Sequence, residues 1–171
     1  MKSLLPQSAA GERKEAYREL LKALLERGQG RIRWIGGVQL VVSDDHDPKS
    51  PLVAIKFAVA TELPEARWQR CSVHFERNIL AQVPARESKA VVEELKVVFK
   101  AKRLSTSRAL AKDFVEHYRS RFPKAVKVFE SGLDDALSFL AFPSSHQRLI
   151  RSTNLLERLF REVKRTRRVR P

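Results

Sequence analysis

The sequence predicts an α/β protein that is mostly helical. A short β-branched run over residues 38–42 predicts one strand, and residues 67–73 predict a second. A long stretch rich in Ala, Glu, Lys and Leu over residues 87–122 predicts helices. The chain has 171 residues, of which 43% are hydrophobic, so it has enough apolar side chains for the packed core of a domain of roughly 100–200 residues.

The first expected elements are a helix, a strand and a second helix. Residues 12–27 have a broad apolar face of Ala and Leu, followed by a glycine that can end a helix. The strand over residues 38–42 ends in a polar run, and the end of a buried strand is where α/β folds often place chemistry. Residues 52–60 are apolar and ambiguous between helix and strand. We expect a helix there, interrupted by Pro64.

Beyond the second strand the pattern is helical to the end of the chain. Proline, glycine and capping residues divide this region into segments. The expected segments are a helix over residues 74–82, the helical stretch 87–122, a helix over 125–142 with a weak point at Ser131 and Gly132, a loop at residues 143–145, and a final helix from Asn154 that Ser152 or Thr153 can cap.

The final helix is expected to be amphipathic. Its apolar residues share one face, which we expect to lie against a core. Glu157 with Arg161, and Arg158 with Glu162, have the i,i+4 spacing of surface ion pairs. The apolar residues of this face are Leu155, Leu156, Leu159 and Val163.

The positive charge of the chain is concentrated at this helix. The net charge of the chain is +14. Residues 146–171 have nine basic and two acidic residues, so their net charge is half of that total. Cations without local acidic compensation are typical of surfaces that contact phosphates. The candidate contact residues are Arg158, Arg161, Lys164, Arg165, Arg167 and Arg168.

Composition also limits the location of the protein. No apolar run approaches the ~18 residues of a membrane span, and residues 1–11 lack the apolar segment of a secretory signal. The single cysteine, Cys71, excludes an internal disulfide framework and is typical of a reducing compartment. We therefore expect a cytoplasmic protein without membrane association.

Two groups of polar residues are candidates for chemistry. Residues 44–47, Asp-Asp-His-Asp, follow the first strand and are either ligands for Mg²⁺ or a solvated turn. Cys71 and His74 form a C-x-x-H pair, but a structural zinc site needs four ligands and there is no second pair at a suitable spacing. A buried cysteine with a packing or capping histidine is therefore favoured over a zinc site or a Cys-His dyad.

Four sequence blocks occur in a distinctive order. They are LVVSDDH over residues 40–46, RWQRCSVHFERNILAQVP over 67–84, FPSSH over 142–146 and STNLLERLFREVKR over 152–165. These blocks resemble the L-V-x-S-D-x-H, W-Q-R-C-x-x-H-x-x-R-N-x-L, F-P-x-x-H and T-N-x-x-E-R-x-N-x-E-x-K-R-R patterns of the Mutator-type transposases of bacterial insertion sequences. Their order and approximate spacing agree over nearly the whole chain.

The resemblance implies a partial RNase H-like fold of the DDE transposase type, with an all-helical insertion before the last catalytic-type helix. Residues 1–84 would be the partial α/β core and residues 85–145 the helical insertion. Residues 146–171 would be a basic helix that returns to the core. The implied partner is DNA with the terminal inverted repeats of the element, and a homo-oligomer is possible.

The resemblance also implies a metal-dependent reaction. In that chemistry three carboxylates hold two divalent ions, Mg²⁺ or Mn²⁺, which promote cleavage and transfer of DNA strands. Asp44 matches the second aspartate and Glu157 the glutamate, so both are expected to be catalytic metal ligands, with Glu162 the less favoured candidate. Cys71 and His74 match the C-x-x-H of the family, which implies a place beside the site.

The chain also departs from the family pattern. The first aspartate of the family lies upstream of the helix expected over residues 12–27, and no residue here matches it. Pro48 stands in place of a glycine, Gln147 in place of Trp and Phe160 in place of Asn. We therefore expect an N- and C-terminally truncated copy that is inactive by itself. The alternatives are a non-catalytic DNA-binding or regulatory remnant, or a product that folds poorly.

Overall fold

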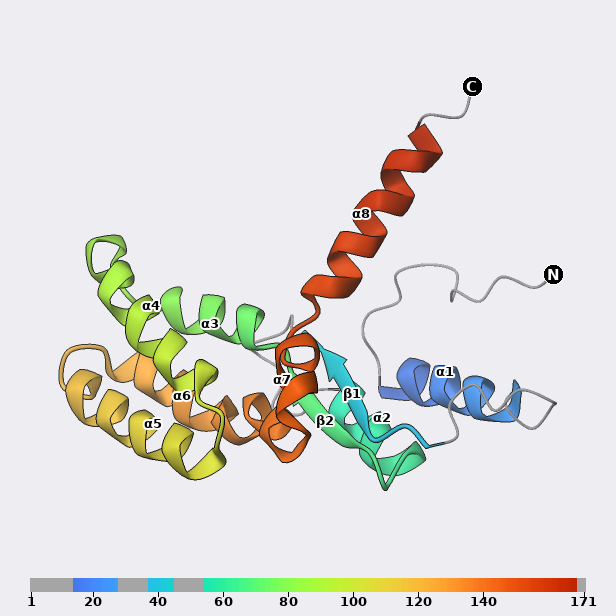
Figure 1. The fold of residues 1–171 in the computed structure, drawn as a ribbon, viewed down its shortest axis with the longest axis horizontal. Coiled ribbons are helices and arrows are strands. Elements are labelled where there is room, and N and C mark those ends of the chain that lie inside the picture. Colours follow the sequence, from blue (N-terminus) through green and yellow to red (C-terminus); the bar gives the residue numbers. More distant parts are fainter. Residues whose placement is uncertain (1–13, 28–36, 45–53, 169–171) are drawn as a thin grey trace. The chain divides into compact units, whose positions relative to one another are not determined.

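The structure is a computed structural model that describes residues 14–27, 37–44 and 54–168 (Figure 1). The chain divides into two compact units. The first comprises Met1–Val41 and Asp47–Trp68, and the second comprises Val42–His46 and Gln69–Pro171. Each unit has its own cluster of buried apolar side chains, so each is stabilised by a separate core.

Two packed helices form most of the described part of the first unit. Helix α1 (Lys14–Arg27) packs against helix α2 (Ala54–Glu62), and Leu21, Val59 and Trp68 are among the buried residues between them. The predicted first helix is therefore confirmed over its described residues. Helix α2 confirms the helical interpretation of the second apolar segment.

Two short strands form a parallel pair. Strands β1 (Leu40–Ser43) and β2 (Arg67–Arg70) are hydrogen-bonded neighbours. The amide of Arg67 donates to the carbonyl of Gln39 at 2.9 Å, and the amide of Cys71 donates to that of Ser43 at 2.8 Å. In both bonds the donor residue lies the same number of positions after the acceptor residue in the sequence. The two strands therefore run in parallel, and their carboxyl ends lie at the same edge. Both predicted strands are confirmed, although the second is shorter because a helix begins at Ser72.

The second unit is helical after β2. Its elements follow one another with short connections, and Figure 1 shows them from green to red. They are α3 (Ser72–Leu80), α4 (Ala85–Lys100), α5 (Leu104–Tyr118), α6 (Pro123–Ala136), the 3₁₀ helix η1 (Ser138–Ala141), α7 (Ser144–Ile150) and α8 (Asn154–Arg168).

Aromatic side chains hold α3–α6 together. Phe75, Phe99, Phe114 and Phe129 come from four different helices, and all are buried. The ring of Phe129 lies 4.6 Å from that of Phe114 and 6.3 Å from that of Phe75, measured between centroids. Because each helix contributes a large apolar side chain to the same cluster, the four helices share one core.

Two residues connect this core to strand β2. Gln69 is fully buried, and its Nε2 donates to the carbonyl of Ala136 at 2.8 Å while its Oε1 accepts from the amide of Phe139 at 2.7 Å. Gly132 lies where a Cβ atom would collide with the side chains of Arg70 and Phe75. The predicted weak point at Gly132 is therefore wrong: α6 continues through it, and the glycine allows close packing.

Two more predicted boundaries differ from the structure. The helical stretch 87–122 is two helices separated by residues 101–103, where Ala101 has an extended ψ of 139° and the sequence has no glycine or proline to signal a break. The predicted loop at 143–145 instead begins helix α7. Pro143 occupies the capping position, where its missing amide hydrogen costs nothing.

Candidate functional site

The site lies at the carboxyl edge of the two strands, within the second unit. Asp44 directly follows β1, and Cys71 directly follows β2. The parallel register brings the two chain positions to the same edge. Asp44 therefore lies where the sequence predicts it, at the carboxyl end of a strand, although the residues of β1 are only partly buried. The other residues of its acidic run, 45–47, lie outside the described residues.

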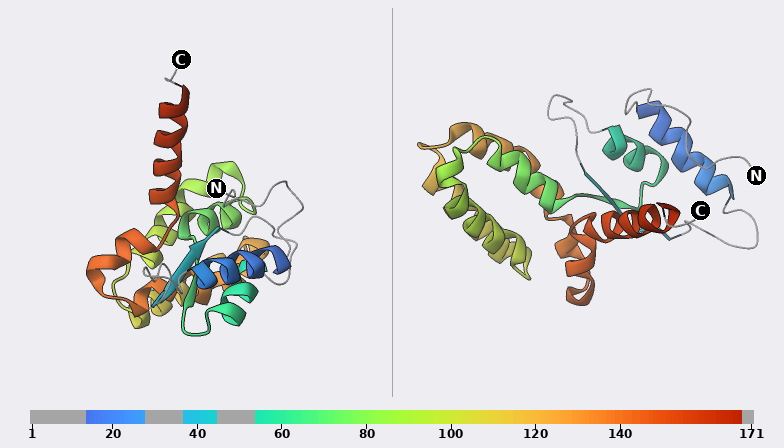
Figure 2. Two further views of the ribbon diagram at one scale, coloured as in Figure 1. Left: turned by 90° about the vertical axis from the view of Figure 1, so that its right-hand side faces the viewer. Right: turned by 90° about the horizontal axis from the view of Figure 1, so that it is seen from above.

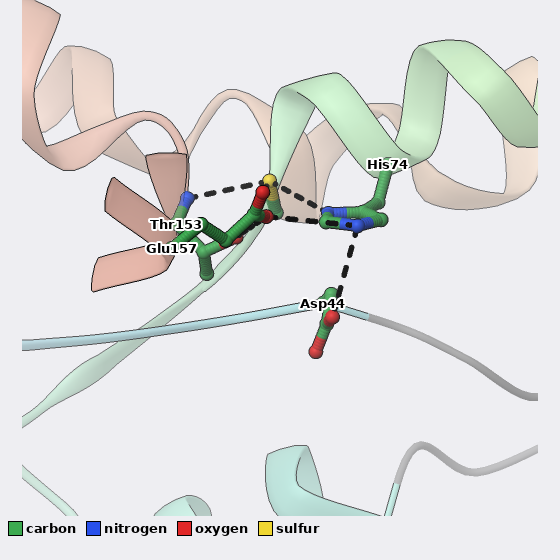
Figure 3. A network of polar contacts seen from close by, with 5 residues as sticks. Asp44, His74, Thr153 and Glu157 are labelled. Carbon is green, nitrogen blue, oxygen red and sulfur yellow. Dashed lines mark hydrogen bonds and ion pairs between the residues drawn. The ribbon is translucent and has the colours of Figure 1, made fainter. Parts of the chain in front are cut away.

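His74 contacts both predicted catalytic carboxylates. It lies in the first turn of α3, and its Nε2 is 3.8 Å from Oδ2 of Asp44 and 3.8 Å from Oε1 of Glu157 (Figure 3). The two carboxylate oxygens are therefore separated by no more than twice that distance. The structure brings together Asp44 and Glu157, which are far apart in the sequence, around one imidazole ring.

Cys71 contacts the other nitrogen of the imidazole ring of His74. Its side chain is fully buried, and its Sγ lies 3.3 Å from Nδ1 of His74. The amide and hydroxyl groups of Thr153 each lie 3.4 Å from the same sulfur (Figure 3). The interpretation of Cys71 as a buried cysteine packed with a histidine is confirmed. The sulfur links α3 to the residue that precedes α8.

Further contacts fix the beginning of α8. The amide of Ser72 donates to the carbonyl of Arg151 at 2.9 Å, and the amide of Glu157 donates to the carbonyl of Thr153 at 3.1 Å. The Thr153 hydroxyl also lies 3.2 Å from Oε1 of Glu157. Thr153 therefore positions Glu157 directly. Sequence reasoning considered Thr153 only as a helix cap, although it belongs to the same block as Glu157.

The donor atoms of this cluster suit part of a Mg²⁺ site. Asp44 and Glu157 supply the hard carboxylate oxygens that Mg²⁺ prefers. Among the described residues, no three His, Cys, Asp or Glu side chains are arranged to hold a metal ion. Asp44 and Glu157 therefore do not form a complete metal site with other described residues. Glu162, the less favoured candidate, is 3.0 Å from Arg165 instead.

The predicted phosphate-contacting residues follow Glu157 along α8. Arg158, Arg161, Lys164 and Arg165 are exposed, and the side chains of Arg167 and Arg168 lie outside the described part. The predicted i,i+4 ion pairs do not form, because Glu157 contacts His74 and Thr153 while Glu162 contacts Arg165.

The apolar face of α8 is exposed. Within the second unit, α8 extends away from the other helices (Figures 1 and 2). The prediction that this face lies against a core is wrong for the described residues. Helical periodicity shows which residues share a face, but it does not show what covers that face. The exposed fractions of the residues predicted for this face, Leu155, Leu156, Leu159 and Val163, lie between 42% and 62%, and the neighbouring Phe160 is 60% exposed.

No helix in the described ranges is sufficiently long and apolar to cross a membrane.

Comparison with known proteins gives consistent results. The sequence model of a family described as "Transposase, Mutator family" matches residues 4–171. The transposase for insertion sequence element ISRM5 of Rhizobium meliloti (strain 1021) is 34% identical over 157 residues, which cover 92% of this chain and 36% of the relative. The transposase for IS256 in transposon Tn4001 of Staphylococcus aureus is 32% identical over 170 residues, with coverages of 92% and 42%.

A third relative is matched over a similar share of its length. The transposase for insertion sequence element IS406 of Burkholderia multivorans (strain ATCC 17616 / 249) is 31% identical over 162 residues, which cover 94% of this chain and 39% of the relative. The chain therefore spans less than half the length of the curated relatives it matches.

Proposed function

The chain belongs to the Mutator family of transposases, and we propose that Asp44 and Glu157 form part of a centre that cleaves and transfers DNA strands. The related proteins are transposases of insertion sequence elements. The proposed substrate is DNA at the ends of such an element, and the proposed cofactor is Mg²⁺ or Mn²⁺.

The observation that carries the proposal is the meeting of Asp44 and Glu157 at His74. Each carboxylate lies 3.8 Å from the same ring nitrogen. Two carboxylates in one site repel each other, and a divalent cation relieves that repulsion. Their placement therefore supports metal binding.

The order of elements supports an RNase H-like core. A parallel strand pair delivers Asp44 at its carboxyl edge, and a block of helices, α4–α6, separates β2 from the helix that carries Glu157. This order agrees with the helical insertion over residues 85–145 that the family resemblance implies.

The residues of the site have distinct proposed roles. Asp44 and Glu157 hold the metal, and His74 positions both carboxylates from one side. Cys71 and Thr153 fix the imidazole and the first turn of α8. Divalent ions bound there would activate water or a 3′-hydroxyl and stabilise the leaving oxygen of a phosphodiester. The exposed cations of α8 contact the phosphates of the same DNA.

Metal titration of the 171-residue chain tests the two ligands. The free Mn²⁺ signal in electron paramagnetic resonance measures how much of the ion is bound. We expect Asp44→Asn and Glu157→Gln each to weaken Mn²⁺ binding, because each removes a carboxylate ligand. Glu162→Gln is the matched control on the same helix and should bind Mn²⁺ as the unaltered chain does. Equal affinity in all four proteins would contradict the proposal.

The same chain allows a test of strand chemistry. Asp44 and Glu157 are one fewer than the three carboxylates that the family resemblance implies. We therefore expect the 171-residue chain by itself to bind DNA without nicking or joining it in Mg²⁺ or Mn²⁺. Robust metal-dependent nicking that Asp44→Ala abolishes would show instead that the chain completes its own site.

A further inference from the structure

A pocket of about 560 Å³ lies beside the carboxylate cluster in the second unit. Its walls come from α3, α4, α7 and the beginning of α8. This volume falls within the range of about 300–1,000 Å³ that is usual for sites enclosing small organic ligands, and it is sufficient for a nucleotide. None of the roles proposed above accounts for it.

The pocket is strongly basic. Among the described residues that line it, five are cationic and one, Glu76, is acidic. Burial raises the pKa of Glu76, with Glu93 acting in the same direction and Lys96 and Arg151 opposing them, so this carboxyl retains its proton more readily than a solvated one. The cationic residues are Lys96, Lys100, Arg148, Arg151 and Arg158.

The positive charge of the pocket exceeds the negative charge near it, and three of its cations have no direct acidic partner among the described residues. Lys96 is paired with Glu93 at 2.8 Å, and Nη1 of Arg151 lies 3.4 Å from the carbonyl oxygen of Phe99. The side chains of Lys100, Arg148 and Arg158 are exposed and make no hydrogen bond or ion pair within the described part of the chain. Lys96 and, to a smaller extent, the nearby Lys100 lower the pKa of the Glu93 carboxyl. Cations that converge on a concave surface without acidic partners create a potential that attracts anions.

The pocket adjoins the carboxylate cluster through the chain itself. Ser72 and Arg151 line the pocket, and the amide of Ser72 donates a hydrogen bond to the carbonyl of Arg151. Ser72 directly follows Cys71 of the cluster, and Arg151 lies two residues before Thr153. Arg158 follows Glu157 on α8. Leu149 and Leu155 add exposed apolar surface to the lining. Cationic groups beside apolar side chains match the phosphates and the sugar or base of a nucleic acid strand.

We propose that this pocket binds the phosphodiester backbone of the DNA strand that enters the carboxylate centre, with Lys100, Arg148 and Arg158 as the principal phosphate contacts. The inference rests on the proposed function. It adds a binding surface from α4 and α7 to the cations of α8. A DNA strand, and not a single bound anion, is the ligand that we propose, because the exposed Leu149 and Leu155 add apolar surface that matches a sugar or base and that a lone anion would not contact.

Fluorescence anisotropy with labelled DNA tests the pocket. The 171-residue chain, the Lys100→Gln/Arg148→Gln variant and the Lys124→Gln/Lys127→Gln control are titrated between 50 and 200 mM KCl without divalent ions. The control removes the same charge from exposed positions on α6. We expect the pocket variant to reduce the slope of log K against log[salt] by about two and to weaken binding at least about ten-fold, while the control retains most of both.

Each result decides the inference. Equal slopes in the pocket variant and the unaltered chain would overturn it, as would an equal loss in the α6 control. Inorganic phosphate provides a further arm: if phosphate alone binds the unaltered chain at millimolar concentration and not the pocket variant, while both proteins bind DNA equally, the pocket is a single-anion site and the strand proposal is wrong. Thermal unfolding midpoints that match the unaltered chain show that the variants are folded.

The two proposals fail in different measurements. The pocket variant keeps Asp44 and Glu157, so its Mn²⁺ affinity in the absence of DNA should equal that of the unaltered chain. If Asp44→Asn and Glu157→Gln leave Mn²⁺ binding unchanged while the pocket variant shows the expected reduction in salt slope, the metal centre is wrong and the pocket is retained. If instead these two variants weaken Mn²⁺ binding while the pocket variant keeps the salt slope of the unaltered chain, the pocket proposal alone is wrong.

Discussion

Helices α3–α6 and helix α8 are both amphipathic, but they use their apolar faces differently. In α3–α6, side chains such as Phe75 and Phe129 are fully buried in a shared core. In α8, Leu159 and Phe160 are more than half exposed. The comparison shows that the apolar faces of α3–α6 stabilise the fold, whereas α8 depends on contacts at its first turn and presents its cations and apolar residues outward.

This difference separates stability from function. A large buried apolar side chain contributes about 1.5–3 kcal/mol relative to an exposed one, so the aromatic core accounts for much of the stability of the second unit. The first turn of α8 is fixed by Thr153 through contacts with Cys71 and Glu157. We therefore expect changes in the core to affect unfolding and changes along α8 to affect binding.

The largest expected effect tests this separation with one type of substitution in both regions. Phe129→Ala should lower the free energy of unfolding by about 3–5 kcal/mol, because it leaves a cavity beside Phe75 of α3 and Phe114 of α5. Phe160→Ala on α8 should change it by less than about 0.5 kcal/mol, because that side chain is exposed. Urea denaturation followed by circular dichroism measures both. Similar losses in the two variants would show that α8 belongs to the stabilising core.

A smaller effect is expected where α6 approaches β2 and α3. A methyl group at Gly132 would collide with Arg70 and Phe75, so Gly132→Ala should destabilise the protein by about 1–3 kcal/mol despite the higher helix propensity of alanine. Ser131→Ala is the neighbouring control at an exposed position of the same helix. Thermal unfolding compares the two variants. A stabilised Gly132→Ala protein would mean that this packing is loose.

The smallest expected effect concerns pH. Burial raises the pKa of Tyr118 to about 12, and its hydrogen bond to Glu94 at 2.7 Å acts in the same direction. Because the folded pKa is higher than the unfolded value of about 10, the associated stability is present below pH 10 and is lost as the pH rises towards 12. Absorbance at 295 nm should show a late-titrating tyrosine that disappears in Tyr118→Phe. Its persistence in that variant would assign the late titration to Tyr17.

Much of the fold could be predicted from local patterns. The β-branched run before Asp44 and the helical periodicity before Arg27 indicated real elements, because period and composition follow directly from burial on one face. The break at residues 101–103 was not predictable in this way, since no glycine or proline marks it. Gly132 was misinterpreted because its reason is a tertiary contact with Arg70 and Phe75.

The candidate site could also be predicted only where local sequence patterns mark it. Asp44 and Glu157 were identified from motif resemblance, and the structure brings both to His74. The contact of Thr153 with Cys71 was not predicted, because it joins residues more than 80 positions apart in the chain. The basic pocket was also missed, since its cations are scattered over α4, α7 and α8 and form no cluster in the sequence.

The central claim, that Asp44 and Glu157 share a divalent metal site, is tested most directly by iron-mediated cleavage of the protein backbone. Fe²⁺ replaces Mg²⁺ in the 171-residue chain with bound DNA, and ascorbate with peroxide generates radicals at the bound ion. We expect cuts near Asp44, His74 and Glu157 that excess Mg²⁺ suppresses and that Asp44→Asn removes. Cuts confined to other segments, or cuts at these positions that persist in Asp44→Asn, would contradict the claim.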